Sequence, residues 1–140
     1  MSLEAFAAQV GSDMKSLRQS TGLRNITSSI GSSHLAPDQT GRLLVSRTGP
    51  VVNLVFDMLA FTGDAWVNLG SLPMGLRPIT QQPVAVFWGV NESIFTETSM
   101  LVIRSTGALS FRPRPTGLAR ASATYITTDG FPATMPGSPA

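Results

Sequence analysis

Carboxylates are the side chains of this sequence best suited to acid–base chemistry, but they are scattered. The eight acidic residues are Glu4, Asp13, Asp38, Asp57, Asp64, Glu92, Glu97 and Asp129. No two of them lie in a motif that would pair them as a glycosidase dyad, although folding could still bring two together. The sequence also lacks a Gly-x-Ser-x-Gly elbow, a phosphate loop and a metal-ligand spacing. We therefore predict that the protein is not an enzyme and has no catalytic, cofactor or metal site.

Three aromatic residues in predicted strands could bind a sugar instead: Trp66, Trp88 and Tyr125. Their rings combine a large apolar face with a polar edge, which suits stacking on a sugar ring. Aromatic residues in strands pack in a core more often than they bind a sugar. The three residues are nevertheless expected as possible glycan contacts.

The first element is a predicted helix over residues 1–22, which Ser2 can cap and Gly22 can end. Apolar residues spaced 4, 3, 4 and 3 apart form the a/d repeat of a coiled coil: Leu3, Ala7, Val10, Met14 and Leu17. A lone helix of about 20 residues is marginal in water and needs a partner. It could pack on its own domain, but so narrow a seam favours a bundle of copies. The seam does not choose between two strands and three.

Residues 42–128 are predicted to form a β domain. One face of residues 51–58 is apolar, as in a strand packed on a core: Val52, Leu54, Phe56 and Met58. Short strands with turn signals between them are predicted at residues 42–47, 51–58, 65–69, 84–88, 100–104, 108–111 and 121–127. This pattern favours an all-β fold, an antiparallel β-sandwich of jelly-roll type. The expected core includes Leu54, Phe56, Val86, Leu101 and Ile103.

Two segments outside the β domain differ from it in composition. Residues 23–41 are rich in Ser, Thr and Gly, with Ile26, Ile30 and Leu35 as isolated apolar positions, which predicts a linker. Residues 129–140 are rich in proline and cannot be helical. We expect them to form an extended C-terminal tail that lies on a surface, including that of a neighbouring subunit.

The distribution of charge argues against several partners. The net charge is +2, and the arginines are scattered, whereas nucleic-acid binding needs clustered positive charge. No stretch approaches the roughly 20 apolar residues of a membrane span, and the N-terminus has no secretion signal. We expect no nucleic acid, no membrane insertion and synthesis in the cytoplasm. Charged residues make up 13% of the chain, about half the usual share, which suits a surface partly covered by copies or neighbours.

Three short segments, spread over most of the length of the chain, form a pattern. Residues 6–17 form the expected helix, and residues 130–137 read Gly-Phe-Pro-Ala-Thr-Met-Pro-Gly. Between them lies a proline-rich corner at residues 72–78 that contains Leu72, Pro73, Gly75, Arg77 and Pro78. Together they resemble the small tail-fibre and minor tail proteins of bacteriophages, particularly those of high-GC hosts. Their corner reads Leu-Pro-x-Gly-aromatic-Arg-Pro and their ending Trp-Pro-x-x-Leu-Pro-Gly, so Leu76, Phe131 and Met135 are departures.

The resemblance implies a structural virion protein that assembles as a parallel homotrimer. Its N-terminal region would join other virion proteins, and its β domain would face outward, toward a host-surface glycan. One alternative is a capsid head fibre or decoration protein of similar design. A second alternative is a fibre-borne glycan depolymerase, which would need paired carboxylates in an exposed groove.

Overall fold

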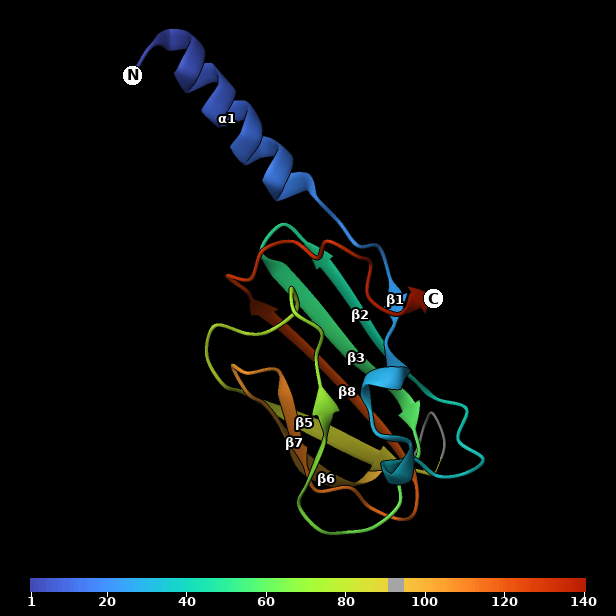
Figure 1. The fold of residues 1–140 in the computed structure, drawn as a ribbon. Coiled ribbons are helices and arrows are strands. Elements are labelled where there is room, and N and C mark those ends of the chain that lie inside the picture. Colours follow the sequence, from blue (N-terminus) through green and yellow to red (C-terminus); the bar gives the residue numbers. More distant parts are fainter. Residues whose placement is uncertain (91–94) are drawn as a thin grey trace.

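The computed structural model describes residues 1–90 and 95–140, which form an N-terminal helix followed by a curled antiparallel sheet (Figure 1). The helix α1 covers Leu3–Arg18, and two short 3₁₀ helices, η1 (Thr27–Ser29) and η2 (Ser32–His34), precede β2. The strands are β1 (Arg24–Asn25), β2 (Arg42–Thr48), β3 (Val51–Leu59), β4 (Val67–Ser71), β5 (Gln82–Gly89), β6 (Phe95–Ile103), β7 (Ala108–Phe111), β8 (Leu118–Ile126) and β9 (Ser138–Pro139). The prediction of a mostly β chain with an N-terminal helix is confirmed.

Each of the seven predicted strands is present in the structure; β7 has the predicted bounds, and the others differ by a few residues at one or both ends. The largest shift is in β6, which begins at Phe95 rather than at residue 100. The sequence does not predict β1 and β9, because two residues are too few to show any alternation.

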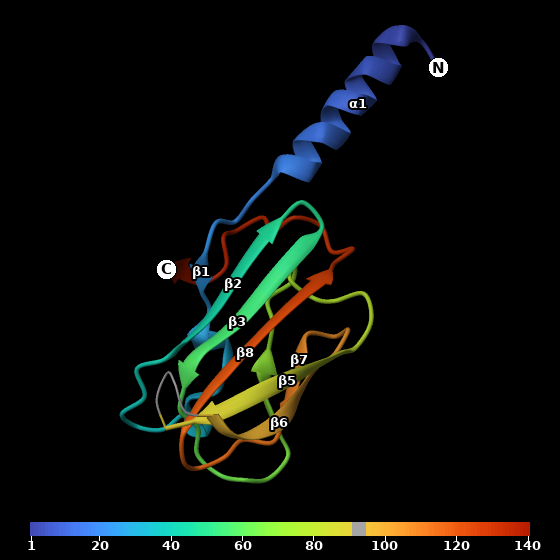
Figure 2. The ribbon, with the colours of Figure 1, turned by 180° about the vertical axis from the view of Figure 1, so that it is seen from behind.

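In the described part of the chain, nine strands share one hydrogen-bonded sheet in the order β4-β7-β6-β5-β8-β3-β2-β1-β9. Neighbouring strands pair antiparallel. Figure 2 shows β2, β3, β8 and β5 side by side. The sheet curls, and the segment after β1 reaches the opposite edge strand, where Gly31 N donates to Leu69 O at 2.7 Å. The described strands form one continuous sheet that curls around the core, and the jelly-roll-like sandwich stays a prediction.

β3 shows why the alternating pattern predicted most of the core but missed one position. Leu54 and Phe56 are each 2% exposed. The ladder with β8 then shifts register between Phe56 and Leu59, and Met58 takes a positive φ of 57°. This bulge leaves Met58 half-buried and turns Leu59 into the core. The prediction that Met58 continues the core face is therefore wrong.

An aromatic cluster fills the core. The rings of Trp88 and Phe111 stack with centroids 5.8 Å apart, and Phe61 meets Phe111 edge to face at 5.1 Å. Phe56 lies edge to face against the same Phe111 ring at 5.8 Å. The five predicted core residues are all buried, which confirms that part of the prediction: Leu54, Phe56, Val86, Leu101 and Ile103.

Residues 23–41, predicted as a linker, are built into the β domain. Ile26 and Ile30 are 1% and 3% exposed and belong to the core. β1 pairs with β2, and Ile26 N donates to Leu43 O at 2.8 Å. The prediction of a linker is therefore wrong. Because the segment is mostly polar, its composition did not reveal that Ile26 and Ile30 pack into the core between the two edges of the curled sheet.

The C-terminal segment packs on its own chain. β9 pairs with β1, and Arg24 donates through Nε to Pro136 O at 2.8 Å and through Nη2 to Gly137 O at 3.1 Å. At Gly137 the backbone has a φ of 57°, and a Cβ there would collide with the carbonyl oxygen of Asn25. A glycine is therefore required where the tail crosses β1.

Candidate functional site

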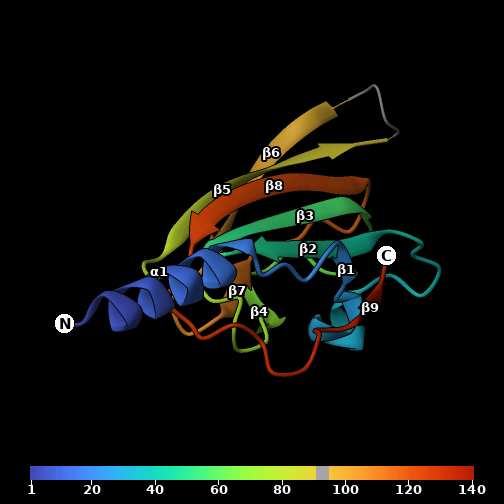
Figure 3. The same cartoon turned by 90° about the horizontal axis from the view of Figure 1, so that it is seen from above.

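α1 projects away from the β domain and buries none of its residues (Figures 1 and 3). The Ser2 side chain caps its first turn by accepting a hydrogen bond from Ala5 N at 3.1 Å. Lys15 and Arg18 lie in the last turn, where positive charge favours the helix dipole. The helix ends at Arg18, before the predicted Gly22, because the chain becomes extended at Gln19.

The predicted seam residues all lie on the surface of this helix. Ala7 is exposed, and the larger side chains have high exposed fractions: Leu3 82%, Val10 40%, Met14 47% and Leu17 61%. Had α1 packed on its own domain, this stripe would be covered. Within the described residues it is not, so the alternative of a helix packed on its own domain is wrong.

The exit of the helix is fastened to the β2–β3 hairpin. Thr21 N donates to Arg47 O, and Arg47 N donates to the Thr21 hydroxyl, both at 2.9 Å. Gly49 N donates to Gln19 O at 2.8 Å. A Cβ at Gly49 would lie 2.9 Å from Leu17 O, so the hairpin turn approaches the last turn of the helix closely. These contacts fix where α1 leaves the β domain.

The corner motif is a structural clamp. Its members are largely inside the fold, with Leu72, Gly75 and Pro78 buried, and Pro73 and Arg77 half-buried. We find no ligand-facing arrangement among these described side chains.

Asp129 holds this corner from the C-terminal segment. Its Oδ2 accepts backbone hydrogen bonds from Gly75 N at 3.0 Å and Arg77 N at 3.2 Å. Its two oxygens also accept from Nε and Nη2 of Arg77, each at 3.0 Å. The hydrogen bond from the Arg77 side chain, with those from the two amides, lowers the pKa of Asp129 although burial opposes the shift. The pair therefore stays charged at neutral pH.

Arg47 connects three parts of the chain. It is 6% exposed, and its guanidinium donates to four carbonyl oxygens: Gly49 at 2.7 Å, Gly75 at 2.6 Å, Asp129 at 2.9 Å and Gly130 at 3.0 Å. Its Cζ also lies 5.4 Å from the centroid of the Phe131 ring. Burial lowers the pKa of Arg47, opposed by the charge of Asp129. Arg47 follows Leu43 and Val45 on the inward face of β2. In the sequence, this position indicates that its guanidinium must find hydrogen-bond partners inside the protein.

The aromatic platform suggested by the sequence does not form. Trp88 is 2% exposed and donates from Nε1 to the Ser99 hydroxyl at 2.7 Å. Tyr125 is 4% exposed and donates to Leu76 O at 2.7 Å, and burial raises its pKa. Trp66 is 57% exposed. Trp88 and Tyr125 are therefore core residues, which corrects their assignment as possible glycan contacts.

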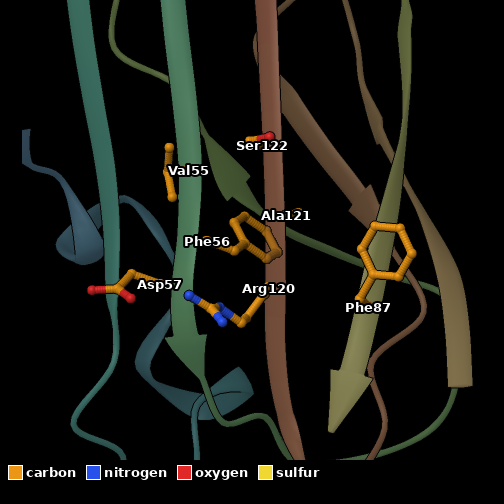
Figure 4. Close-up of a pocket in the computed structure, with 7 residues that line it drawn as sticks. All are labelled: Val55, Phe56, Asp57, Phe87, Arg120, Ala121 and Ser122. Carbon is orange, nitrogen blue, oxygen red and sulfur yellow. The ribbon is translucent and has the colours of Figure 1, made fainter. Parts of the chain in front are cut away.

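A shallow depression of about 270 Å³ lies on the outer face of the sheet, across β3, β8 and β5 (Figure 4). We call it the outer-face depression. It is lined by Val55, Asp57, Phe87, Arg120 and Ser122, above the buried Phe56 and Ala121. The strand register places Phe87 directly beside Arg120 and Val55 beside Ser122. Adjacent residues of a strand face opposite sides, so burying Trp88 necessarily places Phe87 outside.

The side chains of this depression combine aromatic and charged groups. Phe87 is 47% exposed, and its ring meets that of Phe95 edge to face with centroids 6.4 Å apart. The Arg120 Cζ lies 5.9 Å from the Phe95 centroid. In Figure 4 the guanidinium of Arg120 extends from β8 toward β3, on the side of Asp57. Asp57 itself pairs with Arg42, whose Nη2 lies 3.2 Å from its Oδ2.

The described carboxylates do not assemble into a cluster. Residues 1–90 and 95–140 contain no group of three or more His, Cys, Asp or Glu side chains that could hold a metal. Three described carboxylates pair with arginines instead: Asp57, Glu97 and Asp129. Glu92 lies outside the described residues. Among the lining residues of the outer-face depression, Asp57 is the one carboxylate, so this site lacks the pair that glycoside hydrolysis uses.

No protein-family model matches the chain, and a search of curated proteins found no match. No helix in the described part of the chain has the length and apolar character needed to cross a membrane. The arguments for function therefore come from the geometry and the sequence.

Proposed function

We propose that the protein is a structural virion protein of the bacteriophage tail-fibre or minor tail class. Three α1 helices form a parallel coiled coil that joins other virion proteins, and three β domains face outward and adhere to host-surface glycan without turnover. The curled sheet is the counterpart of the jelly-roll-like sandwich in such proteins.

One observation carries this proposal: α1 has an apolar stripe and no partner within the described chain. A helix of 16 residues is marginal in water on its own. Covering apolar surface stabilises by about 25 cal/mol per Å², and the heptad spacing of the stripe suits burial against copies of itself. The seam consists of Leu3, Ala7, Val10, Met14 and Leu17.

The number of copies comes from the resemblance to phage tail proteins, because the seam alone fits two or three strands. Parallel association is compatible with the direction in which α1 leaves the β domain. α1 leaves the β domain at the end that carries the β2–β3 hairpin (Figure 1). Parallel helices therefore gather their domains at one end of the bundle and leave the opposite ends free.

Light scattering on the full chain at micromolar concentration tests the assembly, and a mass of three chains is the expected result. Labelled protein incubated with envelopes of a panel of high-GC bacteria tests adhesion. We expect retention without release of soluble reducing sugar. A monomer contradicts the trimer, sugar release supports a depolymerase, and no retention favours the capsid decoration alternative.

A further inference from the structure

We infer that the outer-face depression, as the adhesive site of the proposed function on which this inference rests, binds a carboxylate-bearing saccharide of the uronic-acid type. No motif in the sequence indicates this site, whose lining residues lie on β3, β5 and β8. Its lining offers the three kinds of contact that such a sugar needs: an apolar ring face, hydroxyl partners and a cation.

The apolar contact comes from Phe87, which lines the depression, and from its neighbour Phe95, whose ring packs against that of Phe87. Phe87 and Phe95 are 47% and 43% exposed, although rings of this size normally contribute to a core. Their edge-to-face arrangement gives them mutual support and presents two ring surfaces at different angles. Val55 adds an apolar flank from β3. A sugar ring has apolar C–H faces that match this surface.

The charge of the depression favours an anion. Asp57 is neutralised by Arg42 at 3.2 Å, whereas Arg120 takes part in none of the ion pairs or side-chain hydrogen bonds found among the described residues. Among the described side chains, Arg42 and Arg120 beside the single carboxylate of Asp57 leave one positive charge. A guanidinium binds a carboxylate through paired, charge-assisted hydrogen bonds, which are about twice as strong as neutral ones.

Polar side chains continue from the depression along β3 and β8. Ser122 lines it, and Thr124 follows two residues later, exposed and donating to Asn53 Oδ1 at 3.2 Å. Hydroxyl and amide groups in a row can exchange hydrogen bonds with successive sugar hydroxyls. The row extends the site beyond one ring, so an oligosaccharide should bind better than a monosaccharide.

A second copy of the same face is a poorer occupant. In a two-fold contact the same patch meets itself, so the net positive charge of the described side chains would face a second copy of that charge. Like charges facing each other in an interface are unfavourable. A saccharide carboxylate has the complementary charge.

The test is a titration of the full-length chain with trigalacturonate, followed by amide chemical shifts. A neutral glucose trisaccharide and acetate serve as probes of the ring and of the charge alone. We expect saturable shifts around Val55, Phe87 and Arg120 with trigalacturonate, and weaker binding of both other probes. Arg120→Gln should weaken binding about tenfold, as expected for loss of a charge-assisted bond, and Phe87→Ala should weaken it as well. Arg104→Gln, an exposed change of equal charge, should leave binding unchanged.

Absence of saturable shifts, shifts centred elsewhere, or equal affinity of Arg120→Gln would overturn the inference. If acetate matches trigalacturonate, the site is an anion site and not a saccharide site. If light scattering shows that Phe87→Ala and Arg120→Gln lower the oligomer mass, the face is an interface between copies. Envelope retention separates the two proposals: variants that adhere as well as the parent refute this site and leave the proposed adhesion intact.

Discussion

Arg77 and Asp129 form a two-point ion pair in which each guanidinium–carboxylate hydrogen bond measures 3.0 Å, across 52 positions of sequence. The same carboxylate accepts the backbone N–H groups of Gly75 and Arg77. One side chain of the C-terminal segment thus fixes the proline-rich corner. Arg47 reaches the same place from the β2–β3 hairpin and bonds to the carbonyls of Gly75, Asp129 and Gly130.

The ion pair should make stability depend on pH. The pKa of Asp129 in the folded chain lies below its ordinary value of 3.8, chiefly because Arg77 bonds to its charged form. Its contribution to the free energy of unfolding is therefore fully present above pH 3.8 and is lost as the pH falls through the lower, folded-state pKa. Urea unfolding should show Asp129→Asn clearly less stable than the parent at pH 7, with the gap closing toward pH 2. Two results would contradict this role of Asp129. One is a stability difference between parent and Asp129→Asn that stays constant over this pH range. The other is the same pH-dependent difference in the exposed Asp38→Asn variant.

Arg47→Met should destabilise the protein by about 3 kcal/mol or more, because four carbonyl groups lose a charged donor in a buried place. Chemical unfolding at pH 7 measures the loss. Arg104→Met removes an exposed arginine and should change stability by less than about 0.5 kcal/mol. Equal effects of the two substitutions would show that Arg47 does not hold the three segments together.

Phe56→Ala should cost roughly 3 to 5 kcal/mol, because it leaves a cavity beside the Phe61 and Phe111 rings. Thermal unfolding should show a large fall in Tm. Phe87→Ala removes a ring of the same size from the outer face and serves as the matched control, with a much smaller effect. A Phe56→Ala protein that melts with the parent would refute the core assignment.

Val10→Asp should lower the mass of the oligomer, because it places one carboxylate per chain near a shared axis where water is scarce. Ser12→Asp, on the side of the helix away from the seam, should leave the mass unchanged. Light scattering distinguishes the two. A chain that begins at Gln19 keeps the contacts of Thr21 with Arg47. If that chain remains trimeric, the β domain rather than the coiled coil holds the assembly.

Gly137→Ala should release the C-terminal segment from β1, because the added Cβ meets the carbonyl oxygen of Asn25 and the backbone is in the left-handed region. Hydrogen exchange of residues 136–140 and of β1 should become faster. Gly130→Ala, where a Cβ meets nothing within 4 Å, should leave exchange unchanged. Equal protection in both variants would mean that the crossing tolerates a side chain.

The sequence predicted those parts of the fold that depend on local periodicity. Alternation in β3 identified Leu54 and Phe56 as core, and heptad spacing identified the helix α1, whose predicted seam residues are exposed. Contacts between distant segments could not be predicted in this way. The burial of Ile26 depends on the curl of the whole sheet, and the pairing of Arg77 with Asp129 depends on where the tail returns.

The candidate site shows the same limit. Aromatic content alone suggested Trp88 and Tyr125 as binding residues, but a strand with adjacent Phe87 and Trp88 must bury one and expose the other. The larger ring, that of Trp88, lies in the core. Phe87, which the sequence did not suggest as a binding residue, faces outward. Tyr125 shares its inward face with Ala121 and Ala123, so alternation already indicated its burial.

The fastening of α1 to the β2–β3 hairpin determines how the molecule would carry mechanical load. Residues 20–25 run antiparallel beside β2, from the Ser20–Thr48 bridge to the Asn25–Leu44 pair. Hydrogen bonds of an antiparallel ladder lie perpendicular to the strands. A pull along this segment, with the β domain held by a surface and the helix by a particle, therefore shears these bonds together instead of opening them one by one. The joint should resist tension better than its few hydrogen bonds suggest.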